Sequence, residues 1–216
     1  MEYWEQAVQE LCLRDPVIKG LVDRYGDDRL RGSGDPFKTL CNAIVGQQIS
    51  TAAAGNIWRR LNEALPEFSA AALLAASDTI LRTCGLSQRK IEYLRGIADA
   101  VLKGSIDFAA LENAEDDEVR QALCAIRGIG PWTAEMFLVF HLRRPDILPL
   151  GDVALQRACA AWYGWPDQKG PAPCMATPYM ATHRSRLEEL GQTWRPWRTV
   201  ATWYLWRDLD STPIVY

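Results

Sequence analysis

The sequence predicts an all-α protein with about ten short helices. Apolar residues recur at helical spacing over most of the chain, and the alternation that is typical of strands is nearly absent. Serine, glycine and proline stand where helix caps and first turns are expected. These observations favour helices packed on helices around an apolar core.

Three apolar series, over residues 37–45, 91–101 and 119–126, repeat every three or four positions and define helices. The predicted boundary residues are the N-caps Ser77 and Ser87, the glycines just past helix ends Gly85 and Gly104, and the first-turn prolines Pro131 and Pro196. One long irregular stretch is predicted from Gly164 to Thr182, because it is rich in proline.

Length and composition place the chain among ordinary globular proteins, with 216 residues of which 48% are hydrophobic. No apolar run approaches the roughly 20 residues of a membrane span, and the N-terminus lacks the regions of a signal peptide. We therefore expect an intracellular, cytoplasmic protein. The six cysteines are scattered without a C-x-x-C pair, which predicts reduced thiols and no zinc or iron–sulfur centre.

The net charge of −3 argues against a uniformly basic nucleic-acid surface, although a local positive face is still possible. From His141 to Arg207 there are nine lysines or arginines and five acidic residues. So small an excess is also typical of solvated helix faces, and charge alone does not identify a partner.

The segment LCAIRGIGPWTAEMFLVF, from Leu123 to Phe140, predicts a helix-hairpin-helix over residues 117–142. A first helix ends at Ile126, a Gly-Ile-Gly turn follows, and Pro131 opens a second helix. Gly128 and Gly130 allow a tight turn and the close approach of a phosphate, which the N–H groups at the start of the second helix would face. Such a hairpin binds the DNA backbone without reading bases.

Several polar residues near the hairpin are candidates for contacts with the DNA backbone. Arg127 and Thr133 belong to the hairpin itself. Gln88, Arg89 and Lys90 form a second group, and for these three as for Arg127 a solvated helix face is an equally good interpretation. If the contacts are real, binding of DNA should weaken steeply as the salt concentration rises.

Asp152 ends the segment LPLGD at the start of a predicted helix over residues 153–162. Its simplest interpretation is the N-cap of that helix. It is also a candidate catalytic carboxylate, because a capped carboxylate has a fixed orientation and would stabilise positive charge on a nearby sugar. The two roles are compatible.

Four segments in this order resemble the helix-hairpin-helix DNA glycosylase superfamily and, within it, the 3-methyladenine DNA glycosylase II family. They are DPFKTLCNAIVGQQIS (Asp35 to Ser50), the hairpin, LPLGDVALQRA (Leu148 to Ala158) and WRPWRTVATWYLWR (Trp194 to Arg207). The resemblance implies two helical lobes with the active-site cleft between them. It predicts a six-helix lobe over residues 36–149 that contains the hairpin, and a second lobe from 1–35 with 150–216 that carries the catalytic aspartate. The chain resembles the compact branch, without the extra N-terminal domain of some members.

By the same resemblance Asp152 is the catalytic carboxylate, and Gln48 inserts its side chain into the base stack. Trp132 and Trp206 fall at base-pocket positions, together with Met136, which stands where some relatives have an aromatic residue. Aromatic faces attract a cationic alkylated base. The backbone carbonyls of three hairpin residues would hold a structural Na⁺ or K⁺, namely Cys124, Ile126 and Ile129.

These assignments predict excision of alkylated purines, of the 3-methyladenine and 7-methylguanine type, from double-stranded DNA by a monomeric enzyme in base excision repair. A methylated purine is already positively charged and leaves without a general acid, so that one carboxylate suffices and no cofactor is needed for catalysis. Glycosylases that also cut the strand use a lysine nucleophile. In the resemblance, Trp132 stands at the position of that lysine, and no lysine lies between Lys103 and Lys169. We therefore expect a monofunctional enzyme, which releases the base without cutting the strand.

Three alternatives stay open at this point. The same fold could act on another lesion, such as an oxidised or mismatched purine. A non-catalytic DNA-binding module would explain the hairpin, but it would not require Asp152 with the aromatic residues. A helical scaffold for protein partners would leave the hairpin unexplained.

Overall fold

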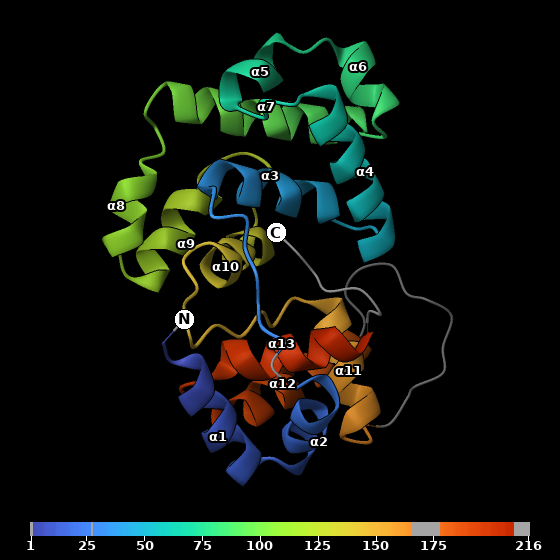
Figure 1. Ribbon diagram of the computed structural model, residues 1–216, viewed down its shortest axis with the longest axis vertical. Coiled ribbons are helices and arrows are strands. Elements are labelled where there is room, and N and C mark those ends of the chain that lie inside the picture. The colour runs from blue at the N-terminus through green and yellow to red at the C-terminus, as the bar shows by residue number, and fades with distance from the viewer. Residues whose placement is uncertain (1, 27, 166–177, 210–216) are drawn as a thin grey trace. The chain divides into compact units, whose positions relative to one another are not determined.

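The computed structural model describes residues 2–26, 28–165 and 178–209, with residues 178–182 described for their backbone only (Figure 1). Within these ranges the chain forms thirteen helices and no extended strand, so the predicted all-α class is confirmed. The helices are α1 (Trp4–Arg14), α2 (Pro16–Tyr25), α3 (Pro36–Gly46), α4 (Thr51–Ala64), α5 (Ala70–Ala75), α6 (Asp78–Thr83), α7 (Gln88–Leu102), α8 (Phe108–Asn113), α9 (Asp116–Cys124), α10 (Pro131–Phe140), α11 (Val153–Trp162), α12 (Pro178–Thr193) and α13 (Arg198–Leu209).

The chain divides into two compact units. Unit 1 covers Met1–Leu30 and Arg143–Ile214, and unit 2 covers Arg31–Leu142. The sequence placed the lobe boundaries a few residues later, before residue 36 and after residue 149. As a result, the segment that leads to Asp152 belongs to the unit of Asp152 itself.

Unit 2 contains eight helices, α3 to α10, where six were predicted. Three of the eight, α5, α6 and α8, are only six residues long, and the number six was implied by the resemblance rather than counted along the chain.

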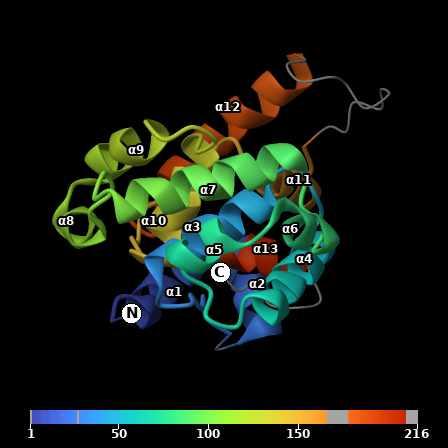
Figure 2. The same cartoon turned by 90° about the horizontal axis from the view of Figure 1, so that it is seen from above.

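Helix α3 forms the centre of unit 2. Every residue from Phe37 to Val45 except Lys38 is buried, and α3 packs against α4, α7 and α10 (Figure 1). Helix α10 contacts both α3 and α9, which explains why it is buried on almost every side. Helices α5 and α6 pack beside α7, as Figure 2 shows.

Helix α13 forms the centre of unit 1. Its residues from Thr199 to Trp206 are buried, and it packs against α1, α2 and α11. A buried carboxylate, Asp15, joins distant parts of this unit. It caps α2 through the N–H groups of Val17 and Ile18, and it accepts hydrogen bonds from the Tyr163 hydroxyl and the Trp194 indole.

Most predicted boundaries are confirmed. Ser77 and Ser87 cap α6 and α7, and the helix after Asp152 covers the predicted residues. Pro131 opens α10 as predicted, but Pro196 lies in a turn before α13, which begins at Arg198. The Pro196 prediction was wrong because a first-turn proline and a proline just before a helix give the same sequence signal.

The predicted irregular stretch from Gly164 to Thr182 is only partly described, since residues 166–177 lie outside the described ranges. At its end the prediction was wrong, because α12 already begins at Pro178. A proline is compatible with the first position of a helix, where no N–H group is needed.

Cys174 also lies outside the described ranges, and the other five cysteines are free thiols. In the part of the chain that the structure describes, no helix has both the length and the apolar character needed to cross a membrane.

Candidate functional site

The hairpin joins α9 to α10 through a turn that only glycine can form at Gly128. Gly128 has φ +100°, and a Cβ atom there would lie 2.3 Å from Cγ of Tyr93. The turn is closed by a hydrogen bond of 3.0 Å from the Ile129 N–H group to the Ile126 carbonyl. Gly128 is therefore required by the packing of the hairpin itself.

Gly130 occupies a different environment. Its backbone is extended, with φ −105° and ψ 179°, and a Cβ atom built on it would meet no atom within 4 Å. The first backbone hydrogen bond of α10 runs from Ala134 to the Gly130 carbonyl, so the preceding N–H groups lie at the end of the helix where anions bind. Gly130 is the N-cap of α10, a position that favours glycine, and among the described residues no atom would meet a Cβ there.

Thr133 does not lie on the surface. The residue is 1% exposed, and its hydroxyl accepts a hydrogen bond of 2.9 Å from Nε2 of Gln47. Thr133 is therefore engaged inside unit 2, and its hydroxyl is not presented to a DNA backbone.

The basic residues around the hairpin differ in how far they are already engaged. The Arg127 side chain is 82% exposed and forms an ion pair of 3.4 Å with Glu92. Arg89 donates to the Tyr93 hydroxyl. The ammonium group of Lys90 donates to the Val45 carbonyl at 2.7 Å, and partial burial lowers its pKa. Arg127 and Arg89 are thus both exposed, whereas Lys90 is half-buried.

Gln48 lies in the four-residue loop between α3 and α4. The side chain is exposed, and the backbone has φ +59°, a left-handed conformation that residues with a side chain rarely adopt. Ile49 beside it is 38% exposed. The loop therefore presents a polar and an apolar side chain at a constrained tip.

Sequence reasoning missed Gln47, the residue before this tip. Its Nε2 atom donates to the Gly128 carbonyl at 3.0 Å as well as to Thr133. Gly128 lies 81 positions away along the chain. No local pattern distinguishes this glutamine from its neighbour Gln48, so the contact is visible only in the folded chain.

Asp152 caps α11, as predicted. Its Oδ1 atom accepts hydrogen bonds from the Leu155 N–H group at 2.6 Å and from Nε1 of Trp206 at 3.3 Å. The residue is 7% exposed. Two donors on one oxygen fix the orientation of the carboxylate, and its position at the helix N-terminus stabilises the negative charge.

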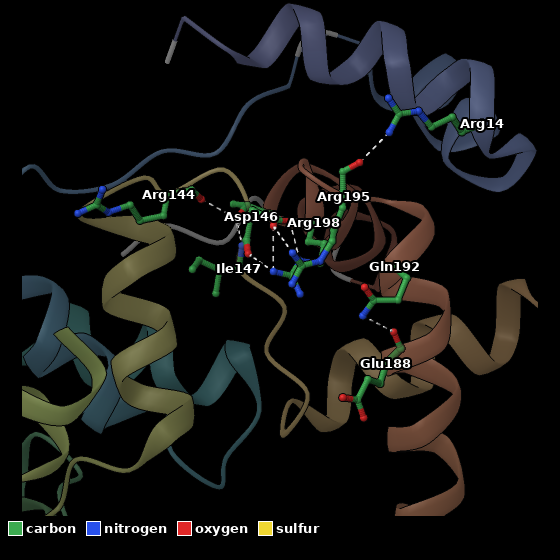
Figure 3. Close-up of polar contacts among 9 residues, drawn as sticks. Arg14, Arg144, Asp146, Ile147, Glu188, Gln192, Arg195 and Arg198 are labelled. Atoms are coloured by element: carbon green, nitrogen blue, oxygen red, sulfur yellow. Dashed lines mark hydrogen bonds and ion pairs between the residues drawn. The ribbon is translucent and has the colours of Figure 1, made fainter. Parts of the chain in front are cut away.

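The segment that leads to Asp152 is bound to the start of α13 (Figure 3). Arg198 donates from Nε to Oδ1 of Asp146 at 2.6 Å, and from Nη2 to Oδ2 and to the main-chain carbonyl of the same residue at 2.9 and 2.8 Å. Thr199 donates its hydroxyl to the Arg144 carbonyl at 2.6 Å and accepts the Ile147 N–H group at 3.0 Å.

The last residues before Asp152 are held by α11. Nε2 of Gln156 donates to the Leu150 carbonyl at 2.7 Å, and the Asp152 N–H group donates to the Pro149 carbonyl at 2.9 Å. Together with the contacts of Asp146, these bonds make the loop that positions the carboxylate rigid.

The three predicted base-pocket residues have different surroundings. Trp206 is 3% exposed and contacts Asp152 through its indole N–H group. Trp132, at the start of α10, is half-buried, whereas Met136 on the same helix is 1% exposed. The structure thus brings Trp206 to the candidate carboxylate and leaves part of Trp132 accessible within unit 2.

The predicted cation ligands lie at the end of α9, for Cys124, and in the hairpin turn, for Ile126 and Ile129. The Ile126 carbonyl accepts the Ile129 N–H group, while the carbonyls of Cys124 and Ile129 accept no hydrogen bond from the described residues. Backbone carbonyl oxygens are typical ligands of Na⁺ and K⁺. Among the described residues no group of three or more histidine, cysteine, aspartate or glutamate side chains could hold a metal ion.

Comparison with known proteins gives a consistent picture. Residues 41–177 match the family described as HhH-GPD superfamily base excision DNA repair protein. The chain is 31% identical over 191 residues to DNA-3-methyladenine glycosylase 1 of Schizosaccharomyces pombe, an alignment that covers 87% of the chain and 78% of the relative.

Two solved structures share the fold. The crystal structure of DNA-3-methyladenine glycosidase from Bacillus halodurans is 36% identical with a TM-score of 0.71, and the match covers 95% of this chain and 89% of that chain. The Schizosaccharomyces pombe 3-methyladenine DNA glycosylase in complex with abasic DNA is 28% identical with a TM-score of 0.79, and the match covers 94% and 95%.

Proposed function

Because the chain belongs to the HhH-GPD superfamily of base excision DNA repair proteins, we propose that it is a monofunctional DNA glycosylase for alkylated purines. Its substrates would be 3-methyladenine and 7-methylguanine in double-stranded DNA, released by hydrolysis of the N-glycosidic bond. The observation that carries the proposal is Asp152, a carboxylate held in one orientation by the Leu155 N–H group and the Trp206 indole.

Hydrolysis of the N-glycosidic bond of an alkylated purine needs no catalytic group other than this carboxylate. Methylation at a ring nitrogen gives the purine a positive charge, so that the base takes the bonding electrons and departs neutral, without a proton from an acid. The sugar becomes an oxocarbenium ion, and water then adds to its anomeric carbon and loses a proton. Asp152 would stabilise the positive sugar, and its fixed orientation means that no reorganisation is needed as the charge develops.

DNA binding is assigned to the hairpin. The phosphate backbone would approach Gly130, where the chain leaves open space, and meet the N–H groups at the start of α10. Gln48 would fill the space in the stack from which the damaged base is flipped. Trp132, which is half-buried in unit 2, would offer an aromatic face to the cationic base, and Trp206 would hold Asp152 through its indole N–H group.

The proposal excludes strand cleavage by a lysine nucleophile. Lyase chemistry in related enzymes needs a lysine that forms a Schiff base with the sugar. Here the corresponding residue is Trp132, and an indole cannot form that adduct. The carbonyls of Cys124, Ile126 and Ile129 would hold a Na⁺ or K⁺ ion that stiffens the hairpin, with no part in the reaction.

Base release from a purine-methylated duplex tests the function. The wild-type protein, acting as a monomer, should liberate 3-methyladenine and 7-methylguanine and leave intact strands with abasic sites, and borohydride should trap no covalent complex. Release of an oxidised or mismatched purine instead would move the activity to another lesion. Binding to damaged DNA without release of any base would leave only a DNA-binding module.

A further inference from the structure

Gln47 connects the loop that carries Gln48 to the hairpin. Its Nε2 atom donates both of its N–H groups, one to the Gly128 carbonyl at 3.0 Å and one to Oγ1 of Thr133 at 2.9 Å. Because a carbonyl oxygen can only accept, the contact with Gly128 fixes which end of the amide faces the hairpin. One side chain therefore bridges the hairpin turn and the start of α10.

The loop is also held at both of its ends. The Lys90 ammonium group donates to the Val45 carbonyl at 2.7 Å where α3 ends, and the Ser50 hydroxyl caps α4 by accepting the Ala53 N–H group at 3.3 Å. Between these points Gln48 adopts φ +59°. Left-handed backbone is unfavourable for a residue with a side chain, so this conformation persists only while its neighbours hold it.

We propose that Gln47 is a positioning residue, which fixes the tip at Gln48 relative to the hairpin that grips the DNA backbone. The proposal rests on the proposed function, in which the hairpin binds a phosphate and Gln48 enters the base stack. Inserting a side chain requires neighbouring bases to unstack, which costs free energy. A loop that is hydrogen-bonded to the hairpin keeps its position when Gln48 is pushed against the base stack, because the hairpin is bound to the DNA backbone. A loop without these hydrogen bonds would be displaced instead.

Two substitutions of Gln47 remove the bridge in different ways. Gln47→Glu keeps the shape of the side chain but has no N–H group, and it sets a carboxylate against the Gly128 carbonyl. Gln47→Met removes both hydrogen bonds without adding charge, which keeps the test valid if the glutamate variant folds poorly. Gln121→Ala serves as the matched control, because Gln121 is an exposed glutamine on α9 in the same unit.

The readout is base unstacking, measured separately from backbone binding. A duplex with a tetrahydrofuran abasic-site analogue beside 2-aminopurine gains fluorescence when the stack opens. Loss of two hydrogen bonds should lower the formation constant of the opened complex about tenfold or more in both Gln47 variants. Affinity for an undamaged duplex, which depends on backbone contacts, should stay within about twofold of the wild type.

A double variant shows whether Gln47 acts through the tip. Gln47→Glu combined with Gln48→Ala should open the stack no less well than Gln48→Ala alone, because both changes remove the same insertion. The proposal is overturned if the two losses multiply, or if both Gln47 variants open the stack as the wild type does. Equal loss of affinity for undamaged DNA would also overturn it, since Gln47 would then merely support the hairpin.

The same experiment distinguishes this proposal from the proposed function. A wild-type protein that opens the stack but releases no base would contradict the glycosylase activity and leave the role of Gln47 intact. A wild-type protein that gives no fluorescence response at all would overturn the role of Gln47, whether or not it releases bases.

Discussion

Replacing Gly130 by alanine separates DNA binding from stability, and Gly128→Ala provides the matched comparison two residues away. At Gly130 the backbone is extended and a Cβ atom meets nothing within 4 Å. Because alanine is a poorer N-cap than glycine, the free energy of unfolding should fall by no more than about 1 kcal/mol. The added methyl group would, however, stand where a phosphate approaches, and affinity for a short duplex should fall about tenfold or more.

Gly128→Ala should behave in the opposite way. The left-handed backbone costs alanine about 1–2 kcal/mol. The added atom would lie 2.3 Å from Cγ of Tyr93, and relieving that overlap costs about 1–3 kcal/mol. The free energy of unfolding should therefore fall by about 2–5 kcal/mol in total.

Urea unfolding and fluorescence anisotropy at one fixed salt concentration measure both quantities. The reasoning is refuted if Gly130→Ala binds DNA as tightly as the wild type, because the open space at Gly130 would then have no role in binding. It is refuted equally if Gly128→Ala unfolds at the wild-type urea concentration.

Two further predictions concern unit 1. Asp146→Ala removes the carboxylate partner of Arg198, whose side chain is 17% exposed, and should lower the free energy of unfolding in urea titrations by about 2–3 kcal/mol. Asp23→Ala, which breaks an exposed ion pair, should change the free energy of unfolding little. Burial and the hydrogen bond to Asp15 raise the pKa of Tyr163 above its ordinary value of 10.0. The stability that the Tyr163 hydroxyl contributes is therefore full below pH 10.0 and is lost as the pH rises beyond it. The difference in unfolding free energy between the wild type and Tyr163→Phe should narrow by about 0.8 kcal/mol from pH 8 to pH 10.5, and a difference that stays constant would contradict this assignment.

Local signals in the sequence predicted the helix boundaries well. Ser77, Ser87 and Asp152 each cap a helix by accepting an N–H group three residues later, a contact that depends only on neighbouring residues. Pro131 opens α10 for a similar local reason.

Contacts between distant residues could not be predicted in this way. Asp15 meets Tyr163 across 148 positions, and Gln47 meets Gly128 across 81. Such pairs are set by how helices pack, which a single sequence does not specify. They determine how the Gln48 tip is held and how unit 1 is tied together.

The candidate site shows the same division. Asp152 was predicted as both cap and carboxylate, and its capping role is confirmed. Thr133 was predicted as a contact for the DNA backbone, but its side chain is buried because α10 packs against both α3 and α9. A helix covered on several sides also buries polar positions that local sequence would place on the surface.

The most direct test of the central claim is single-turnover release of 3-methyladenine from a methylated duplex by Asp152→Asn beside the wild type. Asparagine keeps an oxygen that can accept the Leu155 N–H group, so the cap and the fold should persist while the negative charge is lost. The account predicts a fall in the rate of base release of about a hundredfold or more, with affinity for damaged DNA retained. Release at the wild-type rate by the folded variant would contradict it.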